Sequence, residues 1–82
     1  MHIIVKLFAL LREQARTDTV HLDIPEGANA AQALAVLQRQ YPVLEPYLPR
    51  VRLALHMRFV NAETSLREGD ELALVPPVSG GS

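Results

Sequence analysis

The segment Leu72-Ala-Leu-Val-Pro-Pro-Val-Ser-Gly-Gly81 joins an apolar strand to two prolines and a diglycine. Proline fixes φ at about −65° and has no backbone N–H, so strand pairing is expected to stop at Pro76. Two glycines without Cβ atoms can pass through a channel too narrow for other residues. Composition alone favours a frayed terminus or a Gly/Ser linker. The alternative is a final core strand followed by a spacer and a tip suited to insertion into a partner.

Length and composition limit the remaining possibilities. The 82 residues predict one small domain, and the absence of cysteine excludes disulfides, thiolate metal sites and cysteine nucleophiles. A net charge of −1 with interspersed acids and bases argues against a nucleic-acid partner. No apolar run approaches the roughly 20 residues of a membrane span, and no signal-peptide pattern begins the chain. We therefore expect a cytoplasmic protein with no membrane contact.

Two strands and one helix precede a proline-rich connection, residues 41–50, whose three prolines exclude a regular helix. Residues 2–8 are β-branched and aromatic with apolar side chains on both faces, which predicts a central strand, and 9–16 predict a short helical turn. Residues 20–24 alternate cleanly as a second strand, antiparallel to the first. Apolar residues recur at helical spacing over 30–40, where Asn29 and Gln32 predict a capping box. Residues 51–56 alternate as a third strand.

The end of the chain completes an α+β fold. Residues 58–60 predict a short strand paired with 51–56, and 71–75 predict the last strand after a turn at Gly69. We expect a β-grasp, ubiquitin-like domain over 1–76: a mixed sheet of four to five strands with one main helix on one face. The first and last strands are expected to be central and parallel. Residues 77–82 are expected to form a flexible diglycine tail.

The chain resembles the MoaD/ThiS family of ubiquitin-like sulfur carriers, and most closely its MoaD branch. The matching residues span almost the whole chain, from Lys6-Leu-Phe8 and Leu11-Arg-Glu13 to Ile24-Pro-Glu-Gly27 and Tyr41-Pro42. The most specific match is Leu66-Arg-Glu-Gly-Asp-Glu71 together with the strand and Pro-Pro-Val-Ser-Gly-Gly that follow it. In this context, the better interpretation of the diglycine is a tip that inserts into a partner protein.

The resemblance implies a chemistry for the tail. The carboxylate of Gly81, preceded by Gly80, is expected to be adenylated by an E1-like enzyme that uses ATP, and then converted to a thiocarboxylate. A MoaE-type large subunit, with which the family forms a heterotetramer, is expected to receive the tail. Sulfur then passes to a cyclic pterin precursor in molybdenum cofactor biosynthesis. The chain itself is expected to bind no cofactor and to have no activity alone, because its partners must supply the catalytic groups.

Two positions depart from the family pattern. Ser82 follows the diglycine, whereas the family's carriers end on glycine, so Ser82 is either cleaved off, foreign to the natural chain, or the start of a fused segment. We expect it to be removed before Gly81 can react. His56 stands where the family usually has asparagine, and we interpret it as a surface or turn substitution. His2, His21 and His56 match no metal-ligand spacing, so no metal site is predicted.

A docking surface is the second predicted site. Phe8, Phe59 and Val75 are expected on the sheet face away from the helix, where an uncovered apolar face needs a partner. Pro76, Pro77, Val78 and Ser79 are expected to contact the same partners as the tail enters them. Three alternatives stay open: a ThiS-like role in thiazole synthesis, sulfur donation to cysteine synthesis, and a non-covalent ubiquitin-like binding module.

Overall fold

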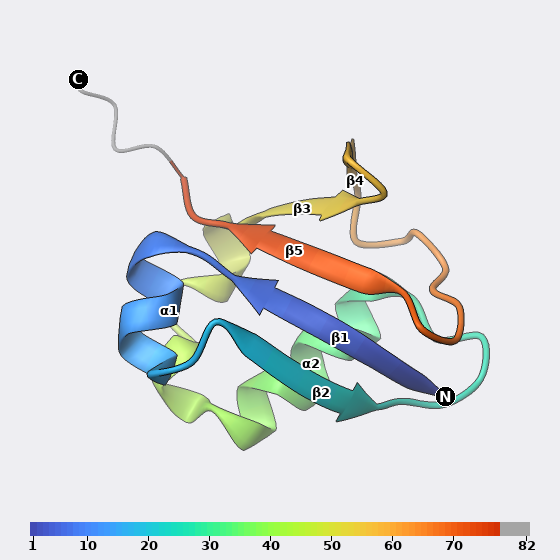
Figure 1. The fold of residues 1–82 in the computed structure, drawn as a ribbon, viewed down its shortest axis with the longest axis horizontal. Coiled ribbons are helices and arrows are strands. Elements are labelled where there is room, and N and C mark those ends of the chain that lie inside the picture. Colours follow the sequence, from blue (N-terminus) through green and yellow to red (C-terminus); the bar gives the residue numbers. More distant parts are fainter. Residues whose placement is uncertain (78–82) are drawn as a thin grey trace.

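The computed structural model describes residues 1–77 and has the predicted α+β fold, with a five-stranded mixed sheet in the order β2-β1-β5-β3-β4 (Figure 1). The strands are β1 (His2–Leu7), β2 (Thr19–Asp23), β3 (Arg52–Leu55), β4 (Arg58–Val60) and β5 (Glu71–Val75). Helix α2 (Ala30–Gln40) packs on one face, as predicted. Within residues 1–77 no helix is long and apolar enough to cross a bilayer.

The two interior strands confirm the central, parallel arrangement predicted for the chain's first and last strands. In the parallel pair Val5 lies beside Leu72 and Leu7 beside Leu74, and β2 and β3 flank the pair on either side. These side chains are fully buried because alternation turns them toward α2. Parallel strands end at the same edge, so β1 and β5 both finish where the C-terminal tail leaves the sheet (Figure 1).

Two short elements connect the strands at that edge. Helix α1 (Ala9–Ala15) follows β1 and ends at Arg16, whose φ of 62° is left-handed and whose N–H donates to the Arg12 carbonyl. The proline-rich segment after α2 forms two 3₁₀ turns, η1 (Pro42–Leu44) and η2 (Leu48–Arg50), with proline in the first turn of each. Proline suits the start of a helical turn, where a missing N–H costs nothing. This agrees with the prediction that no regular helix forms there.

Helix α2 begins at the predicted capping box. The Asn29 side chain accepts from the Gln32 N–H at 2.9 Å, and the Gln32 side chain accepts from the Asn29 N–H at 2.9 Å. The helix ends at Gln40 with Tyr41 as its C-cap, because Pro42 disfavours helical geometry in the residue before it. Its buried residues Ala30, Ala33 and Leu37 lie three or four positions apart and form the stripe that faces the sheet.

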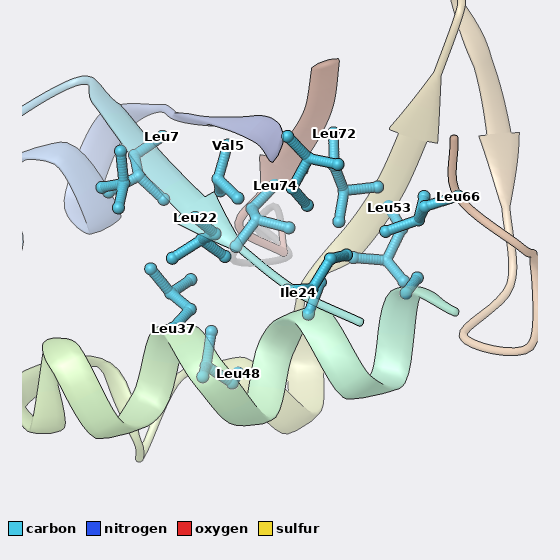
Figure 2. Close-up of a cluster of buried hydrophobic side chains, with 14 of the residues drawn as sticks. Val5, Leu7, Leu22, Ile24, Leu37, Leu48, Leu53, Leu66, Leu72 and Leu74 are labelled. Atoms are coloured by element: carbon cyan, nitrogen blue, oxygen red, sulfur yellow. The ribbon is translucent and has the colours of Figure 1, made fainter. Parts of the chain in front are cut away.

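The core lies between the sheet and α2, and Figure 2 shows leucine side chains of β2, β5 and α2 meeting there. Small alanines on α2 let the helix approach the sheet, while leucines of β1, β5 and α1 fill the space between them. Leu44 and Leu48 of the 3₁₀ turns close one end of this core. No described buried side-chain nitrogen or oxygen lacks a hydrogen-bond partner.

The turn before β5 is fixed to the start of β1. Gly69 has a φ of 82°, as the predicted turn requires, and its N–H donates to the His2 carbonyl at 2.7 Å. The buried Asp70 accepts from the Arg67 N–H at 2.8 Å through Oδ2, and its carbonyl accepts from the Ile4 N–H. These bonds set the register of β5 against β1, and therefore the point at which the tail leaves the sheet.

The hairpin between β3 and β4 contains His56, the residue that stands where the family pattern usually has asparagine. The two-residue loop of His56 and Met57 has φ values of 54° and 67°, which is the pattern of a type I′ turn. Asparagine and glycine adopt this geometry at the lowest cost, which explains why asparagine is favoured at position 56. His56 is exposed in the turn, as predicted, and its Nε2 lies 3.4 Å from Asp70 Oδ1.

Replacing Met57 with glycine is expected to raise the free energy of unfolding by about 0.5–1 kcal/mol. Left-handed geometry costs a residue with a side chain roughly 1–2 kcal/mol, and glycine removes that cost. The greater conformational freedom of glycine in the unfolded chain offsets about half of this gain. Met57 is fully exposed, so no packing is lost. Urea denaturation of M57G and a matched M57A variant measures the effect. A loss of stability in M57G, or an equal gain in M57A, would contradict the turn assignment.

Candidate functional site: an open sheet face beside the tail

The sheet face opposite α2 carries a continuous row of small and apolar side chains. The strand registers place Lys6 beside Ala73, Ala73 beside Ala54, and Ala54 beside Phe59, so the row crosses four strands. Lys6 is held at one end of this row by a 3.0 Å hydrogen bond from its Nζ to Thr19 Oγ1. The middle of the row is flat because alanine side chains are small. A partner can therefore approach the backbone of β5 closely.

Phe8 and Val75, two of the three residues predicted to form a docking surface, lie together at the tail edge. Both line a depression of about 550 Å³ whose floor includes Ala54 and Ala73. The Phe8 side chain is 45% exposed and that of Val75 is half-buried. The prediction that these residues share the open face agrees with this placement.

Phe59 lies on the same face but outside that depression. Its ring is 59% exposed at the far side of Ala54, and the guanidinium carbon of Arg52 lies 3.9 Å from the ring centroid. Arg52 itself is paired across the strands with Val75. A cation–π contact of this kind holds the arginine flat on the aromatic ring. The docking surface is thus two apolar groups bridged by Arg52 rather than one contiguous cluster.

A second depression of about 570 Å³, the tail-root depression, surrounds Pro76 and Pro77, where the tail leaves the sheet. Pro76 and Pro77 form one wall, Leu10 of α1 another, and Tyr47 and Arg50 of the 3₁₀ segment complete it. Leu10, Tyr47 and Arg50 were not among the residues predicted for this site. No local pattern marks them, because they approach the tail only when α1 and η2 fold to the same end of the sheet.

The predicted reactive end lies outside the described residues. Val78, Ser79, Gly80, Gly81 and Ser82 are beyond residue 77, so the roles predicted for them remain predictions. The lining of the depression beside Pro77 contains no carboxylate, histidine or lysine. Its polar side chains among the described residues are those of Tyr47 and Arg50.

Nothing in the sequence places the three histidines together, but the structure brings two of them into contact. Adjacent strands place His2 Nε2 within 2.9 Å of His21 Nδ1, with the rings stacked. Asp23 Oδ1 lies 3.6 Å from His2 Nδ1. His56 belongs to the other hairpin. Within residues 1–77, no group of three or more potential ligands is arranged to hold a metal ion.

Comparison with known proteins identifies the family. A profile of the ThiS family matches residues 5–81, from the first strand through the diglycine. The chain belongs to the ThiS family. The matched region contains the open sheet face, the tail-root depression and the predicted reactive end, so family membership applies to both candidate sites.

The relatives of this ThiS-family chain cover nearly all of it. The molybdopterin synthase sulfur carrier subunit of Chlamydomonas reinhardtii is 32% identical, over 99% of this chain and 100% of that protein. The small archaeal modifier protein 1 of Haloferax volcanii is 39% identical, over 93% of this chain and 97% of that protein. A crystal structure of that modifier superposes with a TM-score of 0.89, over 99% of this chain and 100% of the other, and confirms the β-grasp fold.

Proposed function

We propose that this protein is the sulfur carrier of a molybdopterin synthase, delivering sulfur from a thiocarboxylate at Gly81 to a cyclic pterin precursor. The observation that carries the proposal is the ThiS-family match that extends through residue 81 and includes the diglycine. Full-length similarity to a molybdopterin synthase sulfur carrier subunit supports the choice of acceptor.

The proposed chemistry begins with activation of a carboxylate, which is a poor electrophile. The Gly81 carboxylate attacks the α-phosphorus of ATP and pyrophosphate leaves, which gives an acyl-adenylate. Hydrosulfide from a sulfur donor then attacks the acyl carbon and AMP leaves, so that the carboxyl group becomes a thiocarboxylate. The E1-like enzyme is expected to supply the catalytic groups, because the depression beside Pro77 is lined by no carboxylate, histidine or lysine among the described residues. The carrier contributes a tip without Cβ atoms and a rigid domain that positions it.

The open sheet face is the proposed docking surface for the large subunit and, in turn, for the E1-like enzyme. The face is uncovered, adjoins the strand that leads into the tail, and carries Phe8 and Phe59 with large exposed areas. Exposed apolar side chains around a flat strip of alanines provide area that a partner can bury. Burial there would fix the direction in which the tail leaves toward the partner.

Replacing Phe59 with alanine is expected to weaken binding of the large subunit by about 1–3 kcal/mol, as for an aromatic anchor at an interface. Isothermal titration calorimetry measures the change in Kd. Val43→Ala is the matched control, because Val43 is 44% exposed in η1, away from the open face. Unchanged affinity in F59A, with its folded circular dichroism spectrum retained, would remove Phe59 from the docking surface.

The acceptor is tested by reconstitution with two candidate enzymes. The thiocarboxylate form of the carrier is mixed with a MoaE-type large subunit and the cyclic pterin precursor, and separately with a thiazole synthase and its substrates. We expect a dithiolene product in the first mixture and no thiazole in the second. Thiazole formation, with no dithiolene from a competent large subunit, would instead make the protein a carrier for thiazole synthesis.

Protein modification is a second candidate function, favoured by the 39% identity to a small archaeal modifier protein. The same acyl-adenylate could react with an amine of another protein, which would form an amide and release AMP. Incubating the carrier and the E1-like enzyme with ATP and a cell extract distinguishes the two outcomes. Denaturing gels would show ATP-dependent, thiol-resistant adducts for a modifier, and none for a dedicated sulfur carrier.

A further inference from the structure

The side-chain charges are divided unequally between the two ends of the sheet. The tail end includes the end of β1, α1, the start of β2, the last turn of α2, both 3₁₀ turns and the start of β3 (Figure 1). This end holds six cations against three carboxylates, a formal charge of +3. The carboxylates are Glu13, Asp18 and Glu45. The cations are Lys6, Arg12, Arg16, Arg39, Arg50 and Arg52.

The opposite end has the reverse balance. It comprises the end of β2, the loop into α2, the β3–β4 turn with the start of β4, and the loop into β5 with the start of that strand (Figure 1). Arg58 and Arg67 are the cationic side chains there, against six carboxylate side chains, which gives a side-chain charge of −4. The carboxylates are Asp23, Glu26, Glu63, Glu68, Asp70 and Glu71. The net charge of −1 for the chain therefore conceals a strong separation along the strand direction.

The cations of the tail end are not neutralised locally. In the described part of the chain both ion pairs use histidine, and no lysine or arginine nitrogen lies within 4.0 Å of a carboxylate oxygen. All five arginines of the tail end are exposed. Their field therefore acts on an approaching molecule instead of on a neighbouring acid.

Arg50 places one of these charges beside the tail itself. It lines the depression formed by Leu10, Tyr47, Pro76 and Pro77, which is otherwise apolar apart from the tyrosine hydroxyl. Arg52 is paired with Val75 at the end of β5, and its guanidinium lies over the Phe59 ring. The end of the last strand thus has two arginines beside it, one at the tail depression and one on the neighbouring strand.

We propose that the tail end is an electrostatic guide that docks against an acidic rim around the tail-accepting channel of each partner. The inference rests on the proposed carrier function and adds the chemistry of the partner's surface. That surface has carboxylates around the mouth of the channel and an apolar side chain that enters the tail-root depression. A molecule with +3 at one end and −4 at the other turns that positive end toward an anionic surface. The tail therefore arrives first.

Steering of this kind acts mainly on the association rate. Complementary potentials raise kon by about 10–10³-fold, and the gain falls steeply with ionic strength. The carrier must bind its activating enzyme, leave it, and bind its acceptor enzyme. Fast association without tight binding suits that cycle, because it shortens the search without slowing release.

The test compares two double charge reversals that change the net charge equally. Arg12→Glu with Arg50→Glu alters the tail end, and Arg58→Glu with Arg67→Glu alters the opposite end. Stopped-flow association of each full chain with a MoaE-type large subunit is measured from about 0.02 to 1 M salt, because the Debye length falls to about 3 Å at the upper limit. Circular dichroism verifies that both variants fold.

We expect the tail-end variant to associate about tenfold or more slowly at low salt, within the range of electrostatic steering. The opposite-end variant should associate at least as fast as the unaltered chain, and the three should converge at high salt. Equal slowing in both variants, or a kon without salt dependence, would overturn the guide while leaving the carrier function intact. If the unaltered chain binds neither the large subunit nor an E1-like enzyme, the guide and the proposed function are both wrong.

Discussion

A chain that ends at Gly81 is expected to form a thiocarboxylate about a hundredfold faster than the 82-residue chain. In the longer chain the terminal carboxylate belongs to Ser82, and the Gly81 carbonyl is an amide that cannot attack ATP. An extra residue displaces the reactive carbon by about 3.5 Å in an extended chain. A misplacement of only about 1 Å can cost on the order of a hundredfold in rate.

A third chain separates the two causes of this difference. Ser82→Gly retains the extra residue but removes the Cβ atom, so it isolates displacement from obstruction by a side chain. We expect S82G to remain close to the 82-residue chain, because displacement is the larger effect. Intact-mass spectrometry after incubation with the E1-like enzyme, ATP and a sulfur donor measures all three chains. Equal rates for the 81- and 82-residue chains would show that the tip has been misinterpreted.

Leu74→Ala is expected to lower the free energy of unfolding by about 2–5 kcal/mol, because it leaves a cavity in the centre of the sheet. Leu74 is fully buried in β5, with Leu7 on one side and Leu53 on the other. A domain of this size has roughly 5–15 kcal/mol in total, so the melting temperature should fall by about 10 °C or more.

Leu10→Ala is the matched control for this prediction. It removes the same atoms from an exposed position on α1, and alanine is a better helix former than leucine. We expect a change of under about 1 kcal/mol there, as for other surface substitutions. Urea denaturation followed by circular dichroism measures both variants. A loss below about 1 kcal/mol in L74A would contradict the assignment of β5 as the central strand.

The fold was predictable because local signals agreed with one another. The alternation over 2–8 and 71–75, the capping box at Asn29 and the prolines after Tyr41 each act over a few residues, and the structure confirms each one. Strand order required more than local pattern. The apolar character of both faces identified β1 and β5 as interior strands, and the structure confirms that they pair in parallel.

The candidate site was less predictable because it depends on distant segments meeting. Phe8 and Val75 could be assigned to the open face from alternation alone. Arg50 and Tyr47 meet Pro77 only through the path of the 3₁₀ segment, which no periodicity specifies. The His2–His21 contact depends on the register of β1 against β2, which pairs His2 with Asp23. The separation of charge is likewise invisible in a net charge of −1.

The central claim is that sulfur leaves the Gly81 thiocarboxylate for a pterin, and a single-turnover mass measurement tests it most directly. The thiocarboxylate chain is incubated with a MoaE-type large subunit, with and without the cyclic pterin precursor, and its intact mass is recorded over time. We predict that the mass falls by the difference between sulfur and oxygen only when the precursor is present, while a dithiolene product appears. Retention of sulfur in the presence of the precursor and a competent large subunit would contradict the account.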